Sequence, residues 1–305
     1  DTNFLSNKFL NNWDPSSAIF IDSEIWPNMI NNLKEKSIPI ILLNGRITKK
    51  TFKRWLIFPN FAKKIFKKFD LCLSSNNESK RYLNKLGCKK VKLIGNLKFT
   101  QSENEKIQIN DELKNFIQSR NAWCASSTHE SEEIFCGMVH HELKKIYKNL
   151  LTIIIPRHIE RVQSIEDNLN KLNLKTHLHE PWKKINRKTD IYIVNSYGKT
   201  KSFYNVCKNV FLGGSLVNHG GQNPLEATRF GCNIIHGPNV YNFKEIYKFL
   251  KIKKISININ NQKQMISTIN KLFHKKSNSR SITKKLNLLG QKILYKTHKE
   301  INFFL

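Results

Sequence analysis

Short apolar runs alternate with polar, helix-periodic segments along most of the chain. The first four apolar runs lie at residues 18–24, 38–48, 70–75 and 89–99. The pattern resumes with runs at 121–128, 150–158, 190–199, 209–212 and 232–239. Strands that alternate with helices in this way indicate parallel sheets joined by right-handed crossovers. The sequence therefore predicts an α/β protein.

A charged, glycine-poor stretch near residues 100–110 separates the two strand–helix series. We therefore expect two Rossmann-like domains, residues 1–104 and residues 105–305, with the C-terminal helices assigned to the second. Polar residues gather at the carboxyl ends of the predicted strands, where open α/β sheets bind ligands. Two such domains, with a cleft between their carboxyl edges, are typical of nucleotide-sugar binding.

Residues 211–231, FLGGSLVNHGGQNPLEATRFG, predict a buried strand, a glycine-rich turn and the start of a helix. Gly213 and Gly214 allow the backbone to turn tightly near a ligand. Asn223 occupies the predicted N-cap and Pro224 the first helical position. The free N–H groups at that start favour a phosphate, and Glu226 could accept hydrogen bonds from a ribose diol. The alternative is simply a well-capped helix after a buried strand.

The net charge of +29 indicates affinity for anions, which include nucleotides, nucleic acids and anionic membranes. A general compositional bias toward lysine on a solvated surface is the alternative. Residues 49–68 predict a basic helical stretch with interleaved aromatic residues. This stretch suits either an anionic lipid surface or an amphipathic helix packed on the sheet. We expect no nucleic-acid partner, because no RNP-like aromatic motif or zinc-finger spacing is present.

The six cysteines are scattered, without a CxxC pair or metal-ligand spacing. Several lie in apolar surroundings and are expected to be small buried hydrophobic residues in a reducing compartment. No apolar run reaches the ~18 residues that a membrane-spanning helix needs. The sequence gives no reason to expect a metal or a cofactor.

Six motifs, in one order between residues 18 and 240, resemble those of the 3-deoxy-D-manno-octulosonic acid (Kdo) transferases of lipopolysaccharide biosynthesis. They are DSEIWPNMI, LLNGRIT, GNLKF, ASSTHESEE, PRHIERV and GGSLVNHGGQNPLEA. The resemblance implies a GT-B fold of two Rossmann-like domains. Residues 1–104 would be the C-terminal part of the acceptor-side domain, and residues 105–305 the domain that binds the donor.

The resemblance also implies the reaction. A member of this family transfers Kdo from CMP-Kdo to a lipid A precursor, lipid IVA, with inversion and without a metal-dependent DxD site. It acts at the cytoplasmic face of the bacterial inner membrane, where this chain would be peripheral or anchored through a segment that it lacks. Glu24 and Lys98 correspond to the family's transition-state stabilisers.

The resemblance assigns the CMP contacts to four parts of the chain. These are Pro156 and Arg157; Tyr197, Gly198 and Lys199; Gly214 and Ser215; and Asn223, Pro224, Leu225 and Glu226. The family's Met-Gly-Glu contact is Tyr197-Gly198-Lys199 here, which keeps only the glycine. If that contact is made by backbone atoms, the departure leaves it intact.

The family's general base is an acid that precedes these motifs, and this chain begins after that point. We therefore expect either a fragment of a longer protein, which we favour, or a natural truncation that is inactive alone. The first sheet would then lack strands and expose an edge. The runner-up functions are another GT-B transferase with a UDP-sugar donor and, less favoured, a basic nucleic-acid-binding protein.

Overall fold

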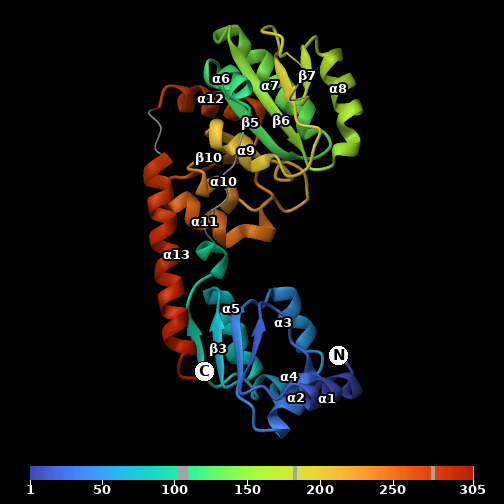
Figure 1. The fold of residues 1–305 in the computed structure, drawn as a ribbon, viewed down its shortest axis with the longest axis vertical. Helices are drawn as coiled ribbons and strands as arrows, with labels where there is room; N and C mark the ends of the chain where they lie inside the picture. The colour runs from blue at the N-terminus through green and yellow to red at the C-terminus, as the bar shows by residue number, and fades with distance from the viewer. Residues whose placement is uncertain (102–108, 181–183, 276–278, 305) are drawn as a thin grey trace. The chain divides into compact units, whose positions relative to one another are not determined.

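The computed structural model describes residues 1–101, 109–180, 184–275 and 279–304, and the chain divides into two compact units (Figure 1). Unit 1 consists of residues 1–101 together with residues 287–305, and unit 2 of residues 102–286. The predicted domain boundary, between residues 104 and 105, lies outside the described residues. Both units are α/β, and every strand pairing among the described residues is parallel, as the alternating pattern predicted.

Unit 1 contains a four-stranded sheet in the order β1-β2-β3-β4. The strands are β1 (Ala18–Ile21), β2 (Ile40–Gly45), β3 (Leu71–Ser74) and β4 (Val91–Leu93). The helices of its N-terminal part are α1 (Asn3–Asn12), α2 (Pro27–Glu35), α3 (Lys49–Trp55), α4 (Pro59–Phe66) and α5 (Asn77–Leu86). The main core of this unit lies between β2 and the helices α4 and α5. It contains the fully buried side chains of Ile40, Leu42, Phe66 and Leu83. In the described residues β1 and β4 are the edge strands of this sheet.

The predicted helical stretch 49–68 is two helices, α3 and α4. Pro59 occupies the first turn of α4, where its missing N–H costs nothing, and it could not continue α3. The break leaves Leu56, Ile57 and Phe58 between the helices.

The last helix, α13 (Ser279–Ile301), departs from the predicted domain assignment. From Asn287 onward it belongs to unit 1, although we expected all C-terminal helices in the second domain. Ile301 packs in a cluster with Ile41, Leu71 and Leu73, on strands β2 and β3. The reason is that these strands are apolar on both faces, so α2, α4 and α5 cannot bury the sheet alone.

Unit 2 contains a seven-stranded sheet in the order β11-β10-β9-β5-β6-β8-β7. The strands are β5 (Asn121–Thr128), β6 (Leu150–Pro156), β7 (Thr176–Leu178), β8 (Ile191–Ile193), β9 (Asn209–Leu212), β10 (Asn233–His236) and β11 (Ser256–Asn258). The helices are α6 (Asp111–Gln118), α7 (Glu132–Ile146), α8 (Val162–Lys171), α9 (Thr200–Val206), α10 (Leu225–Arg229), α11 (Lys244–Ile252) and α12 (Gln262–Phe273). Trp123, Phe211 and Ile235 lie in its core, on three neighbouring strands.

Two local predictions in unit 2 were incomplete. The THESEE sequence predicts Thr128 as the N-cap of the following helix, but Thr128 ends strand β5, and Ser131, with a φ of 73°, precedes α7. The short edge strands β7 and β11 lie in polar sequence that carried no strand signal, because their three residues each are only partly apolar.

The cysteines follow the prediction, since all six are buried. Within the parts of the chain that the structure describes, no helix combines the length and the apolar character needed to cross a bilayer.

Candidate functional site

The glycine-rich segment of unit 2 follows β9, which lies next to the central strand β5 of the seven-stranded sheet. A Cβ atom at Gly213 would lie 2.4 Å from the carbonyl oxygen of Ser127, so only glycine fits there. Gly214 has a φ of +65°, which other residues adopt rarely. Its carbonyl oxygen accepts a hydrogen bond of 2.8 Å from the N–H of Gly221 and closes the loop. The tight glycine turn predicted from the sequence is therefore confirmed.

A buried carboxylate holds this loop in place. Glu132 is 1% exposed, and its two oxygens accept hydrogen bonds from four backbone N–H groups. The donors are His129 at 3.0 Å, Gly214 at 2.7 Å, Ser215 at 3.1 Å and Leu216 at 3.0 Å. These bonds replace the water that the carboxylate loses on burial. Local sequence does not indicate this role, because three of the four donors lie more than 80 residues away.

Ser215, a predicted CMP contact, has its side chain engaged inside the protein. It is fully buried, and its hydroxyl donates to the carbonyl oxygen of Leu212 at 2.5 Å. The hydroxyl also accepts from the N–H of Gly237 at 2.8 Å. The Ser215 side chain therefore ties the ends of β9 and β10 together.

The predicted helix start is one residue out of register. Asn223 accepts a hydrogen bond from the N–H of Leu225 at 3.2 Å through its side-chain oxygen, but α10 begins at Leu225, and Pro224 precedes it. The helix has only five residues, so its dipole at the start is weak. Charge on a phosphate near this loop would therefore be balanced chiefly by side chains. Glu226 lies half-buried in the first turn.

The remaining predicted contacts follow the neighbouring strands β6 and β8. Pro156 ends β6 and is buried, whereas Arg157 is exposed, and its N–H donates to the carbonyl oxygen of Thr128 at 3.0 Å. Tyr197, Gly198 and Lys199 follow β8 and are all exposed. The strand order is β9-β5-β6-β8, so these segments and the glycine loop all follow the carboxyl ends of neighbouring strands and lie at the carboxyl edge of one sheet.

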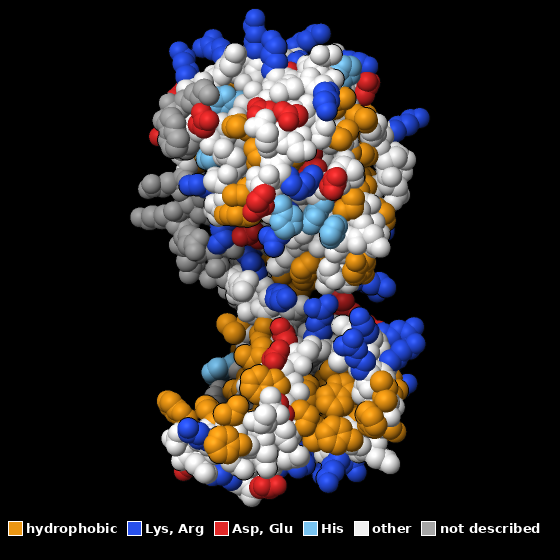
Figure 2. All heavy atoms as spheres, turned by 90° about the vertical axis from the view of Figure 1, so that its right-hand side faces the viewer, with side chains coloured by type: hydrophobic (Ala, Val, Ile, Leu, Met, Phe, Trp, Pro, Cys, Tyr) orange, Lys and Arg blue, Asp and Glu red, His pale blue; other side chains and the backbone are white. Residues whose placement is uncertain are grey.

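Three histidines also lie at this edge. The rings of His129 and His219 are stacked with their centroids 4.2 Å apart, and the ring of His158 lies edge-on to His129 at 6.0 Å. Figure 2 shows histidine side chains side by side on one face of unit 2, with charged side chains around them. Burial, followed by the neighbouring His219 and His158 and the guanidinium groups of Arg161 and Arg157, lowers the pKa of His129 to about 4. The sequence does not reveal this cluster, since the three residues come from separate motifs.

In unit 1 the predicted stabilisers Glu24 and Lys98 follow strands at opposite edges of the sheet. Glu24 is in the turn after β1, and Lys98 is in a short 3-10 helix, Leu97–Thr100, after β4. The apolar run 89–99 predicts Lys98 near a strand end. Instead, β4 stops at Leu93, five residues before Lys98. Four adjacent strands of a sheet span about 14 Å. The side chains can cooperate only if the two turns are drawn toward each other.

Asn44, at the end of β2, connects these two turns. Its side-chain oxygen accepts from the N–H of Leu97 at 3.0 Å, and its amide nitrogen donates to the carboxylate of Asp22. Asn44 is 7% exposed and has a φ of 55°, where the register between β2 and β3 shifts. The irregularity aims the side chain along the sheet edge. An Asn-Gly pair directly after an apolar strand was the available sequence signal.

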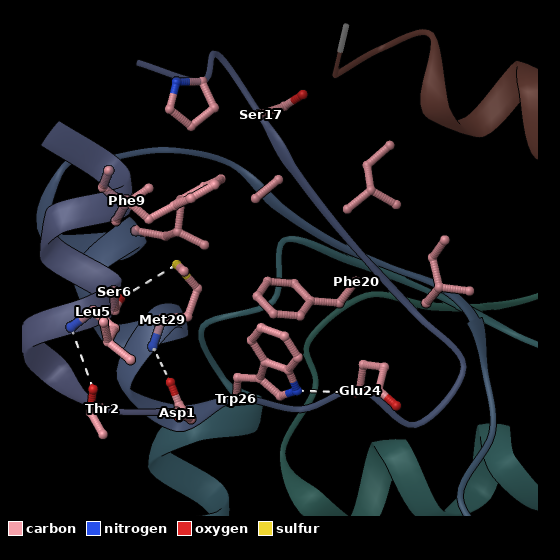
Figure 3. Close-up of a pocket in the computed structure, with 16 residues that line it drawn as sticks. Asp1, Thr2, Leu5, Ser6, Phe9, Ser17, Phe20, Glu24, Trp26 and Met29 are labelled. Carbon is pink, nitrogen blue, oxygen red and sulfur yellow. Dashed lines mark hydrogen bonds between the residues drawn. The ribbon is translucent and has the colours of Figure 1, made fainter. Parts of the chain in front are cut away.

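An apolar cavity of about 700 Å³ adjoins Glu24 in unit 1. It is lined by α1, β1 and the start of α2, with Phe9, Phe20 and Met29 among the lining residues (Figure 3). The indole N–H of Trp26 donates to the Glu24 carboxylate at 3.0 Å and fixes that side chain at the rim. Among the described residues, no group of three or more His, Cys, Asp and Glu side chains could hold a metal ion.

Comparison with known proteins agrees with this arrangement. Residues 1–101 match the family model described as 3-deoxy-D-manno-octulosonic-acid transferase (kdotransferase). The 3-deoxy-D-manno-octulosonic acid transferase of Rickettsia felis is 34% identical over 274 residues, which are 88% of this chain and 58% of that protein. This chain thus spans little more than half the length of that relative.

Two solved structures share the fold. The C-terminal CMP-Kdo binding domain of WaaA from Acinetobacter baumannii matches 60% of this chain and 93% of that domain, with 24% identity and a TM-score of 0.52. UDP-GlcNAc 2-epimerase from Neisseria meningitidis matches 98% of this chain and 79% of that enzyme, with 13% identity and a TM-score of 0.61. The resemblance predicted from the six motifs is therefore confirmed: over most of its length this chain is similar to the 3-deoxy-D-manno-octulosonic acid transferases.

Proposed function

We propose that this chain carries the donor site and part of the reacting centre of an inverting glycosyltransferase, which transfers Kdo from CMP-Kdo to a lipid A precursor, lipid IVA. The observation that carries the proposal is the meeting of four donor motifs at one sheet edge of unit 2, combined with similarity to Kdo transferases over 88% of the chain. Kdo transfer is the activity named for the relatives, whose chains are longer than this one.

In this proposal unit 2 binds the CMP part of the donor. The Arg157 guanidinium, exposed after β6, faces the phosphate, because a planar cation with several donors suits an oxyanion. Glu226 accepts hydrogen bonds from the ribose hydroxyl groups. Tyr197, Gly198 and Lys199 contribute backbone atoms, since Gly198 has a φ of +77° and open space around its Cα atom. Gly214 allows close approach, and Asn223, Pro224 and Leu225 shape the loop.

Unit 1 contributes charge at the reacting centre. Lys98 stabilises the negative charge that develops on the departing phosphate, and Glu24 stabilises the positive charge on the sugar ring. Preorganised charges of this kind act only when they are held still. The Asn44 bridge to Leu97 and the Trp26 bond to Glu24 supply that restraint. We assign the base that deprotonates the acceptor hydroxyl to no residue of this chain.

The turn between α3 and α4 supports a membrane-facing acceptor site. Ile57 is 67% exposed and Phe58 is 69% exposed, and lysine and arginine residues flank them on both helices. Two other aromatic residues of this region pack inward: Phe52 stacks on Tyr82 with ring centroids 4.4 Å apart, and Phe66 is fully buried. Both readings of residues 49–68 therefore have support: the helices pack on the unit, and their connecting turn projects. We propose that this turn rests on the anionic cytoplasmic face of the inner membrane.

Calorimetric titration with CMP, UMP and UDP at moderate salt tests the proposal. We expect selective binding of CMP. A preference for UDP would replace CMP-Kdo with a UDP-sugar as the donor. Salt-sensitive binding of any polyanion without selectivity would contradict a nucleotide-sugar site altogether.

A further inference from the structure

The histidine cluster of unit 2 is built from three separate segments. His129 follows β5, His158 follows β6, and His219 lies in the glycine-rich segment after β9. His129 is 9% exposed, whereas His158 and His219 are exposed. The His129 ring lies against the glycine-rich loop: a Cβ atom on Gly214 would be only 3.1 Å from the ring. The Nε2 atom of His129 lies 3.2 Å from the Nε2 atom of Gln222. Two exposed imidazoles therefore flank a buried one at the edge where the nucleotide phosphate is proposed to bind.

The charged groups around His129 come from every neighbouring element. Arg157 and Arg161, from the segment between β6 and α8, act on it as positive charges. Arg161 is paired with Glu133 of α7 through two hydrogen bonds of 3.1 Å. The Glu132 carboxylate accepts the His129 backbone N–H and is saturated by three further N–H groups. The carboxylate of Glu160 faces His158, and its pKa is lowered by hydrogen bonds from its own backbone N–H and from Tyr197 and also by the nearby His158. At His129 itself the neighbouring imidazoles and guanidinium groups dominate, and together with burial they oppose protonation of that ring.

We propose that the cluster of His129, His158 and His219 takes up a proton when a phosphate monoester binds at this edge of unit 2, so that nucleotide binding strengthens as the pH falls. The proposal rests on the proposed function, because it takes CMP as the ligand of this site.

The physical reason is charge balance. A dianionic phosphate offsets the repulsion among the imidazoles and the two guanidinium groups, and it favours the imidazolium form. The sign follows from linkage: if binding raises a histidine pKa, the complex holds more protons than the free protein between the two pKa values. Affinity then rises as the pH falls through that window. In the free protein the low pKa of His129, about 4, keeps this ring neutral at physiological pH.

Proton uptake can be measured directly. CMP is titrated by calorimetry at pH 7.0 in two buffers of different ionisation enthalpy, and the difference in heat gives the number of protons taken up. Binding that raises the pKa of one group by one unit, across the pH of the titration, takes up about half a proton. We expect an uptake of about that size or larger, and an affinity about two- to threefold weaker at pH 8.0 than at pH 7.0. Cytidine, which lacks the phosphate, should bind without uptake.

The double variant His158→Asn/His219→Asn distinguishes proton uptake by the histidine cluster from a change in the protonation of CMP itself. Both side chains are exposed, so the fold should tolerate the changes, which thermal melting checks. We expect the uptake to fall by at least half. His141→Asn is the matched control, because His141 is an exposed histidine further along α7; its uptake should equal that of the unchanged protein.

CMP binding without uptake, or uptake that the double variant leaves intact, would overturn this inference but leave the proposed function standing. Failure of the unchanged protein to bind CMP would overturn both.

Discussion

Two glutamates of unit 2 have opposite surroundings, and their roles follow from that. Glu132 is buried and saturated by four backbone N–H groups, so it has no capacity left for a ligand. Glu226 is half-buried in the first turn of α10, beside the loop that Glu132 holds. We therefore infer that Glu132 shapes the site and that Glu226 contacts the nucleotide.

Glu226→Ala should weaken CMP binding by about tenfold or more, since a hydrogen bond to a charged group contributes roughly 1.5–3 kcal/mol. Calorimetry with CMP measures the change. Glu142→Ala, at an exposed position of α7, is the control and should bind CMP normally. Equal affinities for the two variants would remove Glu226 from the ribose contact.

Glu132→Gln should destabilise unit 2. The glutamine amide presents an NH2 group to backbone donors, so at least two N–H groups lose their acceptor, at about 1–3 kcal/mol for each buried group left unpaired. For a domain of this size, a loss of about 2 kcal/mol lowers the melting temperature by roughly 4–8 °C. Scanning calorimetry checks this, with Glu142→Gln as the exposed control. A melting temperature unchanged by Glu132→Gln would contradict the structural role.

Sequence reasoning at this scale was strongest for residues whose role depends on nearby positions. The glycine turn and the bond of Asn223 near the start of α10 need only a few neighbours along the chain; the turn could be predicted, and the helix start was predicted to within one residue. Glu132, Asn44 and the histidine cluster depend on partners in distant segments, so their roles became visible only in the structure. The ligand contacts assigned to Glu24, Lys98 and the CMP residues remain predictions.

At the scale of elements, the proposed reacting centre depends on how strand ends are connected. Glu24 and Lys98 belong to turns after the two edge strands, β1 and β4, and Asn44 on β2 bonds to both turns. The arrangement makes Asn44 a positioning residue for Lys98.

Asn44→Ala should free the Leu97 N–H and speed its exchange with solvent by about fivefold or more, given that a hydrogen bond contributes about 1 kcal/mol. Hydrogen exchange followed by NMR measures this single amide. Asn44→Gly, which accepts the φ of 55° without strain, should give the same acceleration if the lost side-chain bond is the cause.

The control is the N–H of Ile94, which donates to the carbonyl oxygen of Ser74 and has no bond to Asn44. Acceleration of Ile94 to the same extent would mean that β4 had loosened as a whole, and it would contradict a local role for Asn44.

The buried parallel strands could be predicted because nearly all their residues are apolar, as in β6. The three-residue edge strands β7 and β11 could not, since strands so short have little pattern. Pro59 was a visible breaker within residues 49–68, and its effect was underestimated. The end of α13 packs on the face of the unit 1 sheet that α2, α4 and α5 leave exposed, and no local sequence pattern indicates that position.

For the whole molecule, the net charge of +29 gives attraction to anionic surfaces but no orientation on them. The exposed turn between α3 and α4 adds an apolar contact, which would fix the part of the molecule that faces the membrane. Ile57→Ser/Phe58→Ser should therefore reduce binding to vesicles that contain anionic lipid by about tenfold, without changing the net charge. Sedimentation with vesicles at several salt concentrations measures the loss.

A matched control is Ile146→Ser/Ile252→Ser, which removes two apolar side chains of similar exposure, 60% and 68%, from unit 2. That variant should bind vesicles like the unchanged protein. Equal losses in both double variants would show that general hydrophobicity, rather than the α3–α4 turn, makes the contact.

The composition of unit 1 has a consequence for how the chain folds as it is made. Gly290 of α13 allows the helix backbone to approach the carbonyl oxygen of Phe99, next to Lys98, and Ile293 packs against Gly95. Glu300 pairs with Lys92 at 2.6 Å. Residues 1–101 leave the ribosome before residues 287–305, which include the part of α13 that supports the Lys98 turn. Unit 2 is contiguous and can fold during translation, whereas the first sheet stays uncovered on one face until residues 287–305 have been made.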